Sequence, residues 1–140
     1  MRVVLDTNIF VSGIHWSGDS NKILLIWRNK RFELIAPIPI IEEIIKTLEE
    51  FRIPLSKEDI SSWENIILEN ALLVEPEESI VVVEDDKDDD KFIEAAVAGK
   101  ADYIVTQDNH LLKIKEFRGI KILTPKEFLD MIKKICECDL

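Results

Sequence analysis

The feature that most constrains this chain is a short apolar run near its start that ends abruptly in polar residues. The run from Arg2 to Leu5 is too short for a helix and rich in β-branched residues, which predicts a buried strand. Asp6, Thr7 and Asn8 follow directly. In open α/β sheets, ligands bind outside the carboxyl ends of the strands, so Asp6 is a candidate site residue. The simpler alternative is that Asp6 only caps the helix that follows.

Short apolar strands alternate with amphipathic helices along the rest of the sequence. Strands are expected at 32–36, 71–74, 103–105 and 120–123, and 79–83 is expected to be extended. Helices are expected at 8–14, from Ser20 to about 31, at 40–51, from Ser56 to about 70, from the acidic run at 84–90 to Gly99, at 111–114 and from Pro125 onward. This alternation predicts one α/β domain over 1–140, with a parallel sheet of about five strands covered by helices on both faces.

Composition and charge narrow the class of protein further. Hydrophobic residues make up 46% and charged residues 33%, which is typical of a folded protein. The net charge of −10 argues against simple nucleic-acid binding. An acidic protein can still act on a polyanion if divalent cations neutralise an acidic pocket, if its basic residues cluster, or if a basic partner assists.

The sequence also carries expectations about the protein's location. No apolar run reaches the roughly 18 residues that a membrane span needs, so we expect no membrane partner. A basic-then-apolar signal segment is not found at Met1. Cys136 and Cys138 are too few for a disulfide framework or a zinc site. A cytoplasmic protein is the expectation.

Acidic residues occur at four places that a doubly wound sheet can bring to one edge. Asp6 and Asp108 each follow a predicted strand, Glu42 and Glu43 open the predicted helix at 40–51, and the run at 84–90 opens another. Crowded carboxylates cannot all stay ionised and unpaired. Mg²⁺ or Mn²⁺ is the expected solution, and two such ions roughly 4 Å apart can support phosphodiester displacement.

Five segments of the chain follow one another in an order that one family shares. They are Leu5-Asp6-Thr7-Asn8, Ile40-Ile41-Glu42-Glu43-Ile44, Asp88-Asp89-Asp90-Lys91-Phe92-Ile93, the stretch from Asp102 to Asp108 and the stretch from Ile122 to Leu129. Taken together, they resemble the PIN domain family, the nuclease fold of many VapBC-like toxins. The resemblance implies a three-layer α/β/α fold, a Mg²⁺- or Mn²⁺-dependent endoribonuclease, frequent dimers and a small antitoxin protein as partner.

The resemblance also implies roles for individual residues. Thr7, Asn8 and Thr106 would hold carboxylates or metal-bound waters in place. A metal-bound water would then attack the scissile phosphate of RNA in line. The catalytic metal ligands would be Asp6, Glu43, Asp90 and Asp108. Glu43 is preferred to its neighbour Glu42 because it lies beside a buried isoleucine stripe.

Helical geometry leaves two candidates in the acidic run. With Ile93 at the centre of the buried face, Asp89 and Asp90 both fall at the edge that faces the sheet, whereas Asp88 and Lys91 are expected to face solvent. The resemblance selects Asp90 as the ligand, and Asp89 is then expected to cap the helix or reach a water molecule.

The sequence departs from the family pattern in two places. Pro37 stands where a Ser or Thr is usual, and His110 stands where a second acid is frequent. We expect little effect from Pro37. His110 either faces solvent or ligates Mn²⁺ through a neutral ring nitrogen, and it puts a second metal site in doubt.

Other functions and surfaces stay open at this point. A non-catalytic PIN-like module that binds RNA or protein is the main alternative, while a phosphatase or receiver-type protein is disfavoured because Asn8 leaves no D-x-D pair. Trp16 either stacks on a base or packs on the second helix. Apolar residues of the helices at 40–70 predict a homodimer. The basic residues that could guide RNA are Arg28, Lys30, Arg31, Lys87, Lys91, Lys113, Lys115 and Arg118.

Overall fold

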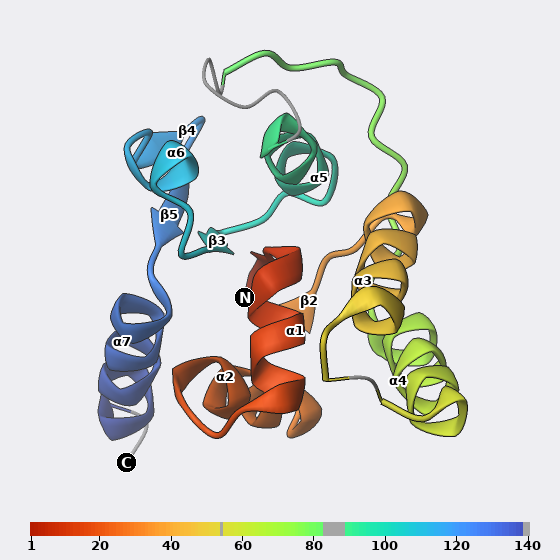
Figure 1. Cartoon of the computed structure of the whole chain (residues 1–140). Helices are drawn as coiled ribbons and strands as arrows, with labels where there is room; N and C mark the ends of the chain where they lie inside the picture. The colour runs from red at the N-terminus through yellow and green to blue at the C-terminus, as the bar shows by residue number, and fades with distance from the viewer. Residues whose placement is uncertain (54, 83–88, 139–140) are drawn as a thin grey trace.

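The fold is built on a central, mostly parallel sheet flanked by helices (Figure 1), as the strand–helix alternation predicts. The computed structural model describes residues 1–53, 55–82 and 89–138. Five strands lie in the order β2-β1-β3-β5-β4, and β4 is antiparallel to β5. The strands are β1 (Arg2–Leu5), β2 (Glu33–Leu34), β3 (Tyr103–Val105), β4 (Glu116–Phe117) and β5 (Ile120–Leu123).

The helices connect these strands and cover the sheet. Helix α5 packs on β1 and β3, α7 packs on β5 and α2, and α1 lies between α2 and α3. Figure 1 shows α4 beside α3 on one side of the molecule. The helices are α1 (Thr7–His15), α2 (Asp19–Arg28), α3 (Ile38–Glu50), α4 (Lys57–Asn70), α5 (Asp90–Ala98), α6 (Asn109–Leu112) and α7 (Pro125–Cys138).

The register of the two central strands brings their carboxyl ends together. Leu5 pairs with Val105 in the parallel ladder, and the backbone N–H of Asp6 donates to the Val105 carbonyl at 3.0 Å. Thr106 continues the ladder on the other side, donating its N–H to Leu123 at 3.0 Å. Asp6 and Thr106 therefore leave the sheet side by side.

One expected strand is absent and another was not foreseen. Residues 71–74 make only a single parallel bridge, from Leu72 to Ile35, and Leu72 and Leu73 are exposed, so the segment leaves the sheet edge after one contact. Strand β4 is too short to show a period in the sequence. It is joined to β5 by Arg118 and Gly119, both at positive φ, as in a tight hairpin turn.

Several expected helix ends are confirmed and others shift. Ser56 caps α4 by accepting from the Asp59 N–H at 3.1 Å, and Pro125 is the first residue of α7. Ser20 is buried inside α2 and Gly18 is the N-cap, so the predicted cap at Ser20 is wrong. Helix α3 begins at Ile38 rather than 40, because proline is tolerated in a first helical turn.

Gly99 is the C-cap residue of α5, but it does not have the left-handed conformation for which glycine is usually found after a helix. Lys100, not Gly99, has the positive φ of 54° that follows the helix. A Cβ at position 99 would lie 2.6 Å from Cδ1 of Ile35, so the side chain is excluded by close packing. The glycine lets α5 approach the residue that follows β2.

The apolar residues on the helices at 40–70 that predict a homodimer are mostly used within the chain. Ile45, Leu48 and Ile67 are buried in its core, whereas Phe51 and Trp63 pack against that core and are partly buried. Dimerisation stays a prediction without support from that face. Within the described residues, no helix has the length and apolar character needed to cross a membrane.

Candidate metal centre

Asp6 forms the floor of the candidate site, where β1 gives way to α1. Its Oδ1 accepts from the backbone N–H of Asn8 at 3.2 Å, and its Oδ2 accepts from the Thr106 hydroxyl at 2.7 Å. Asp6 therefore caps α1 and also lines a pocket, so the two roles considered from the sequence coexist. The side chain is buried, at 5% exposure.

The electrostatics of Asp6 favour a bound cation. Burial raises the pKa of Asp6 above its ordinary value, and the hydrogen bonds from Thr106 and Asn8 oppose that rise only in part. The negative charges of Asp108 and Glu43 raise it further. An ionised Asp6 is thus held in an environment that disfavours its charge, and a cation nearby would relieve that cost.

Asp108 enters the site from the loop after β3, held by the same threonine. Its backbone N–H donates to the Thr106 hydroxyl oxygen at 2.9 Å, and its Oδ1 accepts from the His110 N–H at 2.9 Å. Partial burial raises the pKa of Asp108, but the hydrogen bond with Asp89 and the interactions with His110 outweigh it, so the net pKa is lowered. Asp108 is therefore the more readily ionised of the two strand-end carboxylates.

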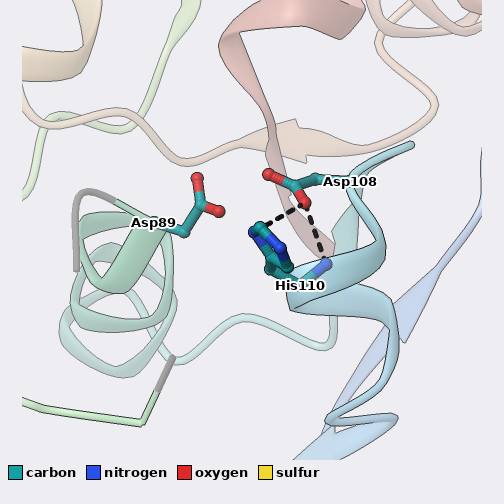
Figure 2. Close-up of side chains that lie close together, drawn as sticks. All are labelled: Asp89, Asp108 and His110. Atoms are coloured by element: carbon teal, nitrogen blue, oxygen red, sulfur yellow. Dashed lines mark hydrogen bonds and ion pairs between the residues drawn. The ribbon is translucent and has the colours of Figure 1, made fainter. Parts of the chain in front are cut away.

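Asp89, Asp108 and His110 converge as a group of candidate ligands (Figure 2). One ligand atom from each lies within 4.8 Å of the others, and Nδ1 of His110 lies 3.6 Å from Oδ1 of Asp108. Asp89 is buried at the N-terminus of α5. His110 thus lies within reach of the two carboxylates while its side chain stays 45% exposed, so ligation of Mn²⁺ by His110 stays a prediction.

Asp90, the ligand selected by resemblance, does not line the pocket. Its Oδ1 accepts from the backbone N–H of Val82 at 3.0 Å, so the carboxylate is directed back towards the extended segment before α5. Asp89 lines the pocket instead. Asp89 is therefore better placed than Asp90 to bind a cation in this pocket, while Asp88 lies outside the described residues.

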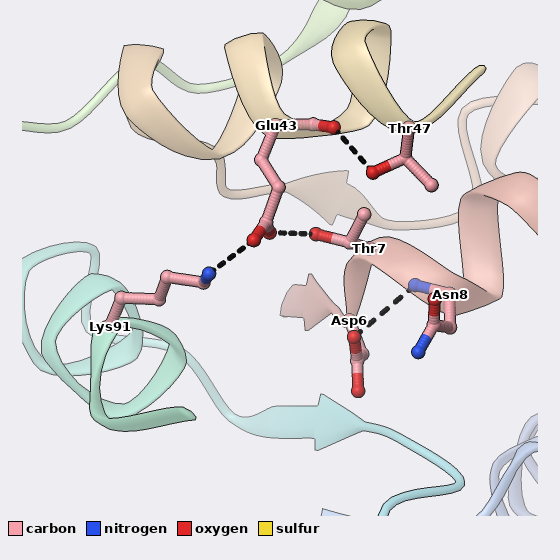
Figure 3. A network of polar contacts seen from close by, with 6 residues as sticks. All are labelled: Asp6, Thr7, Asn8, Glu43, Thr47 and Lys91. Carbon is pink, nitrogen blue, oxygen red and sulfur yellow. Dashed lines mark hydrogen bonds and ion pairs between the residues drawn. The ribbon is translucent and has the colours of Figure 1, made fainter. Parts of the chain in front are cut away.

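Glu43 is held from two sides by side chains of other helices (Figure 3). The Thr7 hydroxyl donates to one carboxylate oxygen, Oε2, and the Lys91 ammonium donates to the other, Oε1. Lys91 and Glu43 side chains are 30% and 32% exposed. The expectation that Lys91 faces solvent is wrong, because its long side chain reaches from α5 across to α3. Glu42 is exposed and Glu43 lines the pocket, so Glu43 is the better placed of the two, and its role as a metal ligand stays a prediction.

These side chains enclose a small polar pocket of about 210 Å³. Thr106 lies beneath it, fully buried. Two lining residues had not been considered as site residues from the sequence: Thr47, one helical turn after Glu43, and Phe92. Helical spacing from Glu43 could have indicated Thr47. The lining residues are Asp6, Thr7, Asn8, Glu43, Thr47, Asp89, Lys91, Phe92 and Asp108.

The remaining sequence candidates lie away from this pocket or face solvent. Arg118 forms a two-bond ion pair with Glu78, at 2.9 and 2.8 Å. Trp16 is 48% exposed, whereas Trp27 is buried against Phe10. Pro37 is the buried N-cap residue of α3, and Lys87 lies outside the described residues.

The donor set of the pocket suits a hard divalent cation. Asp89, Asp108 and Asp6 offer carboxylate oxygens, which Mg²⁺ and Mn²⁺ prefer, and His110 adds a nitrogen that Mn²⁺ accepts. A single cation near Asp89 and Asp108 would also offset the charges that raise the pKa of Asp6. The residues present therefore fit the metal that the acidic convergence implies.

Comparison with known proteins agrees with this geometry. The PIN domain family matches residues 2–110. A chain of VapBC2 from Rickettsia felis, in a crystal structure bound to a DNA fragment from the promoter, superposes with a TM-score of 0.55. The two are 18% identical, over 89% of this chain and 98% of that one, a level that shows a common fold. No curated protein sequence matches this chain.

Proposed function

This chain belongs to the PIN domain family, and from that premise we propose that it is a metal-dependent endoribonuclease that hydrolyses RNA phosphodiester bonds. The observation that carries the proposal is the convergence of Asp6, Asp89 and Asp108 at the carboxyl ends of β1 and β3. Crowded carboxylates at this edge of a parallel sheet are costly for folding unless they bind a cation. Helix capping accounts for Asp6 and Asp108 separately, but the Asp89 side chain makes no capping hydrogen bond and still lies at the same pocket.

The cofactor in this proposal is Mg²⁺ or Mn²⁺. Asp89 and Asp108 would hold it, with Asp6 below and His110 beside them. When bound, the metal supplies an activated water nucleophile and offsets the negative charge of the reacting phosphate. The acidic pocket then becomes compatible with a polyanionic substrate, in spite of the net charge of −10.

The chain's own residues prepare this site before any ligand arrives. Thr106 donates to Asp6 and accepts from the Asp108 N–H, so one buried hydroxyl fixes the spacing of two carboxylates. Thr7 orients the carboxylate of Glu43 from the first turn of α1. Asn8 donates its backbone N–H to Asp6 at the rim of the pocket. Such preorganisation is what positions metal ligands accurately.

We further propose that the protein is the toxin of a type II toxin–antitoxin pair, with a small antitoxin as partner. The fold shared with a chain of the VapBC2 complex supports this. A partner rich in basic residues would complement the acidic surface. A small open reading frame adjacent to the coding sequence, and co-purification of its product with this chain, would support the pairing.

A second candidate is a module that binds RNA or protein without cutting. The observation that favours it is the Lys91–Glu43 ion pair, which ties up one of the carboxylates expected to bind metal. The two candidates differ in their need for metal, because binding without cleavage has no use for a metal-activated water.

An RNA cleavage assay separates the two functions. Purified chain is incubated with structured and unstructured RNA in Mn²⁺, in Mg²⁺ or in EDTA. Internal cleavage in Mn²⁺ or Mg²⁺ that EDTA abolishes supports the nuclease. RNA binding that persists in EDTA, with no cleavage in either metal by folded protein, supports the binding module.

A further inference from the structure

The acidic side chains at the pocket form two groups, which differ in the side chains that contact them. In one group, ligand atoms of Asp89, Asp108 and His110 lie within 4.8 Å of one another. In the other, both oxygens of the Glu43 carboxylate already accept hydrogen bonds, from Thr7 and from Lys91. Figure 3 shows the Lys91 side chain extending from α5 to Glu43 on α3, beside Thr7.

We propose that the Lys91 ammonium takes the place of a second divalent cation beside Glu43, so that the centre binds one metal ion. The inference rests on the proposed metal-dependent function and specifies how that site is built. Glu43 then holds the Lys91 ammonium in place and does not bind the metal ion directly. Lys91 supplies a positive charge next to Glu43 in the same pocket that Asp89 and Asp108 line.

Repulsion on the Glu43 side of the pocket favours one metal over two. Asp6, Glu43, Asp89 and Asp108 bring four negative charges when ionised. With the Lys91 ammonium, one divalent cation would leave a net charge of −1 and two would leave +1, so the total charge does not decide the number of metal ions. The position of the charges does: a second cation on Glu43 would lie next to the ammonium, where repulsion in a half-buried pocket is only weakly screened.

The setting of Lys91 distinguishes this contact from an ordinary surface ion pair. Exposed ion pairs are weak because water competes for both partners. Here both side chains are about one-third exposed, at 30% and 32%, and both line the pocket. The ammonium also lies 5.3 Å from the ring centroid of Phe92, another lining residue. Lys91 follows Asp89 by two residues, so the start of α5 brings both the metal-side acid and the fixed cation.

The proposal is tested by counting bound metal ions in the metal-free protein. Mn²⁺ is titrated into the full chain at neutral pH, and free Mn²⁺ is measured by electron paramagnetic resonance. We expect one Mn²⁺ per wild-type chain, two per chain for Lys91→Met, and one again for the double variant Lys91→Met with Glu43→Gln. Lys46→Met removes an exposed lysine from α3 and should still bind one.

The outcomes separate this inference from the proposed function. Two Mn²⁺ ions on wild type, or only one on folded Lys91→Met, overturn the one-metal centre whether or not RNA is cut. No Mn²⁺ on wild type overturns both. A third outcome is one Mn²⁺ on wild type and two on Lys91→Met, with no RNA cleavage by wild type. That result would support the one-metal centre and rule out the proposed ribonuclease activity. Circular dichroism melting curves establish that each variant is folded.

Discussion

Thr106 donates a hydrogen bond to Oδ2 of Asp6 across 2.7 Å, although the two residues are 100 positions apart in the sequence. Both side chains are buried. The same hydroxyl oxygen accepts from the Asp108 N–H at 2.9 Å. One threonine therefore ties together the ends of β1 and β3 and the two carboxylates that follow them.

Removing this hydroxyl should cost stability without changing the shape of the side chain. Thr106→Val leaves a buried carboxylate oxygen and the Asp108 N–H each without one partner, at a cost of about 1–3 kcal/mol. Urea denaturation of metal-free protein measures it. Thr106→Ser keeps the hydroxyl and serves as the matched control. Equal unfolding free energies for Thr106→Val and wild type would show that the bond contributes nothing.

The positions of Asp89 and Asp90 predict opposite effects of two conservative substitutions. Asp89→Asn should lower metal-dependent cleavage at least a hundredfold, a loss on the order of 2.7 kcal/mol. Asp90→Asn should lower it by less than about tenfold, roughly 1.4 kcal/mol, because an amide oxygen can still accept from Val82. Mn²⁺ affinity by calorimetry should follow the same order. A larger loss at Asp90 would restore the assignment made from the sequence.

The raised pKa of Asp6 predicts how its charge affects stability. Because the pKa in the folded state lies above the unfolded value, protonation favours folding; the stabilisation is complete at low pH and is lost as pH rises through the folded pKa. Asp6→Asn removes the charge but also replaces one accepting oxygen by an NH2 group, so the stability of the metal-free variant relative to wild type should improve as pH rises from 3 to 7. Denaturant melts at both pH values test this. A large loss of stability at pH 7 alone would mean that the ionised carboxylate stabilises the fold.

The helix end at Gly99 gives a prediction about packing. Gly99→Ala places a Cβ 2.6 Å from Ile35, so the core must shift, at a cost of about 1–3 kcal/mol. Gly18→Ala meets nothing within 4 Å and is the matched control. Thermal melts compare the two, and similar melting temperatures would show that Ile35 yields without cost.

Sequence reasoning works best where local chemistry alone decides the structure. The apolar run before Asp6 is a strand, and the Ser56 cap forms as its motif predicts. Which of Asp89 and Asp90 lines the pocket could not be read from helical spacing, because it depends on Val82, whose backbone N–H donates to Asp90 from a segment without regular structure. The expectation that Lys91 faces solvent is wrong for a related reason. Helical spacing gives the position of its Cα, but the ion pair with Glu43 on α3 determines where its ammonium group lies.

A single-turnover cleavage assay in Mn²⁺ tests whether Asp6 belongs to a metal centre that cuts RNA. Wild-type protein should cut RNA internally, and EDTA should stop it. Asp6→Asn should be folded and at least a hundredfold slower, about 2.7 kcal/mol, while Asp130→Asn, an exposed substitution on α7, should match wild type. Full Mn²⁺-dependent activity in Asp6→Asn would contradict the assignment of this site.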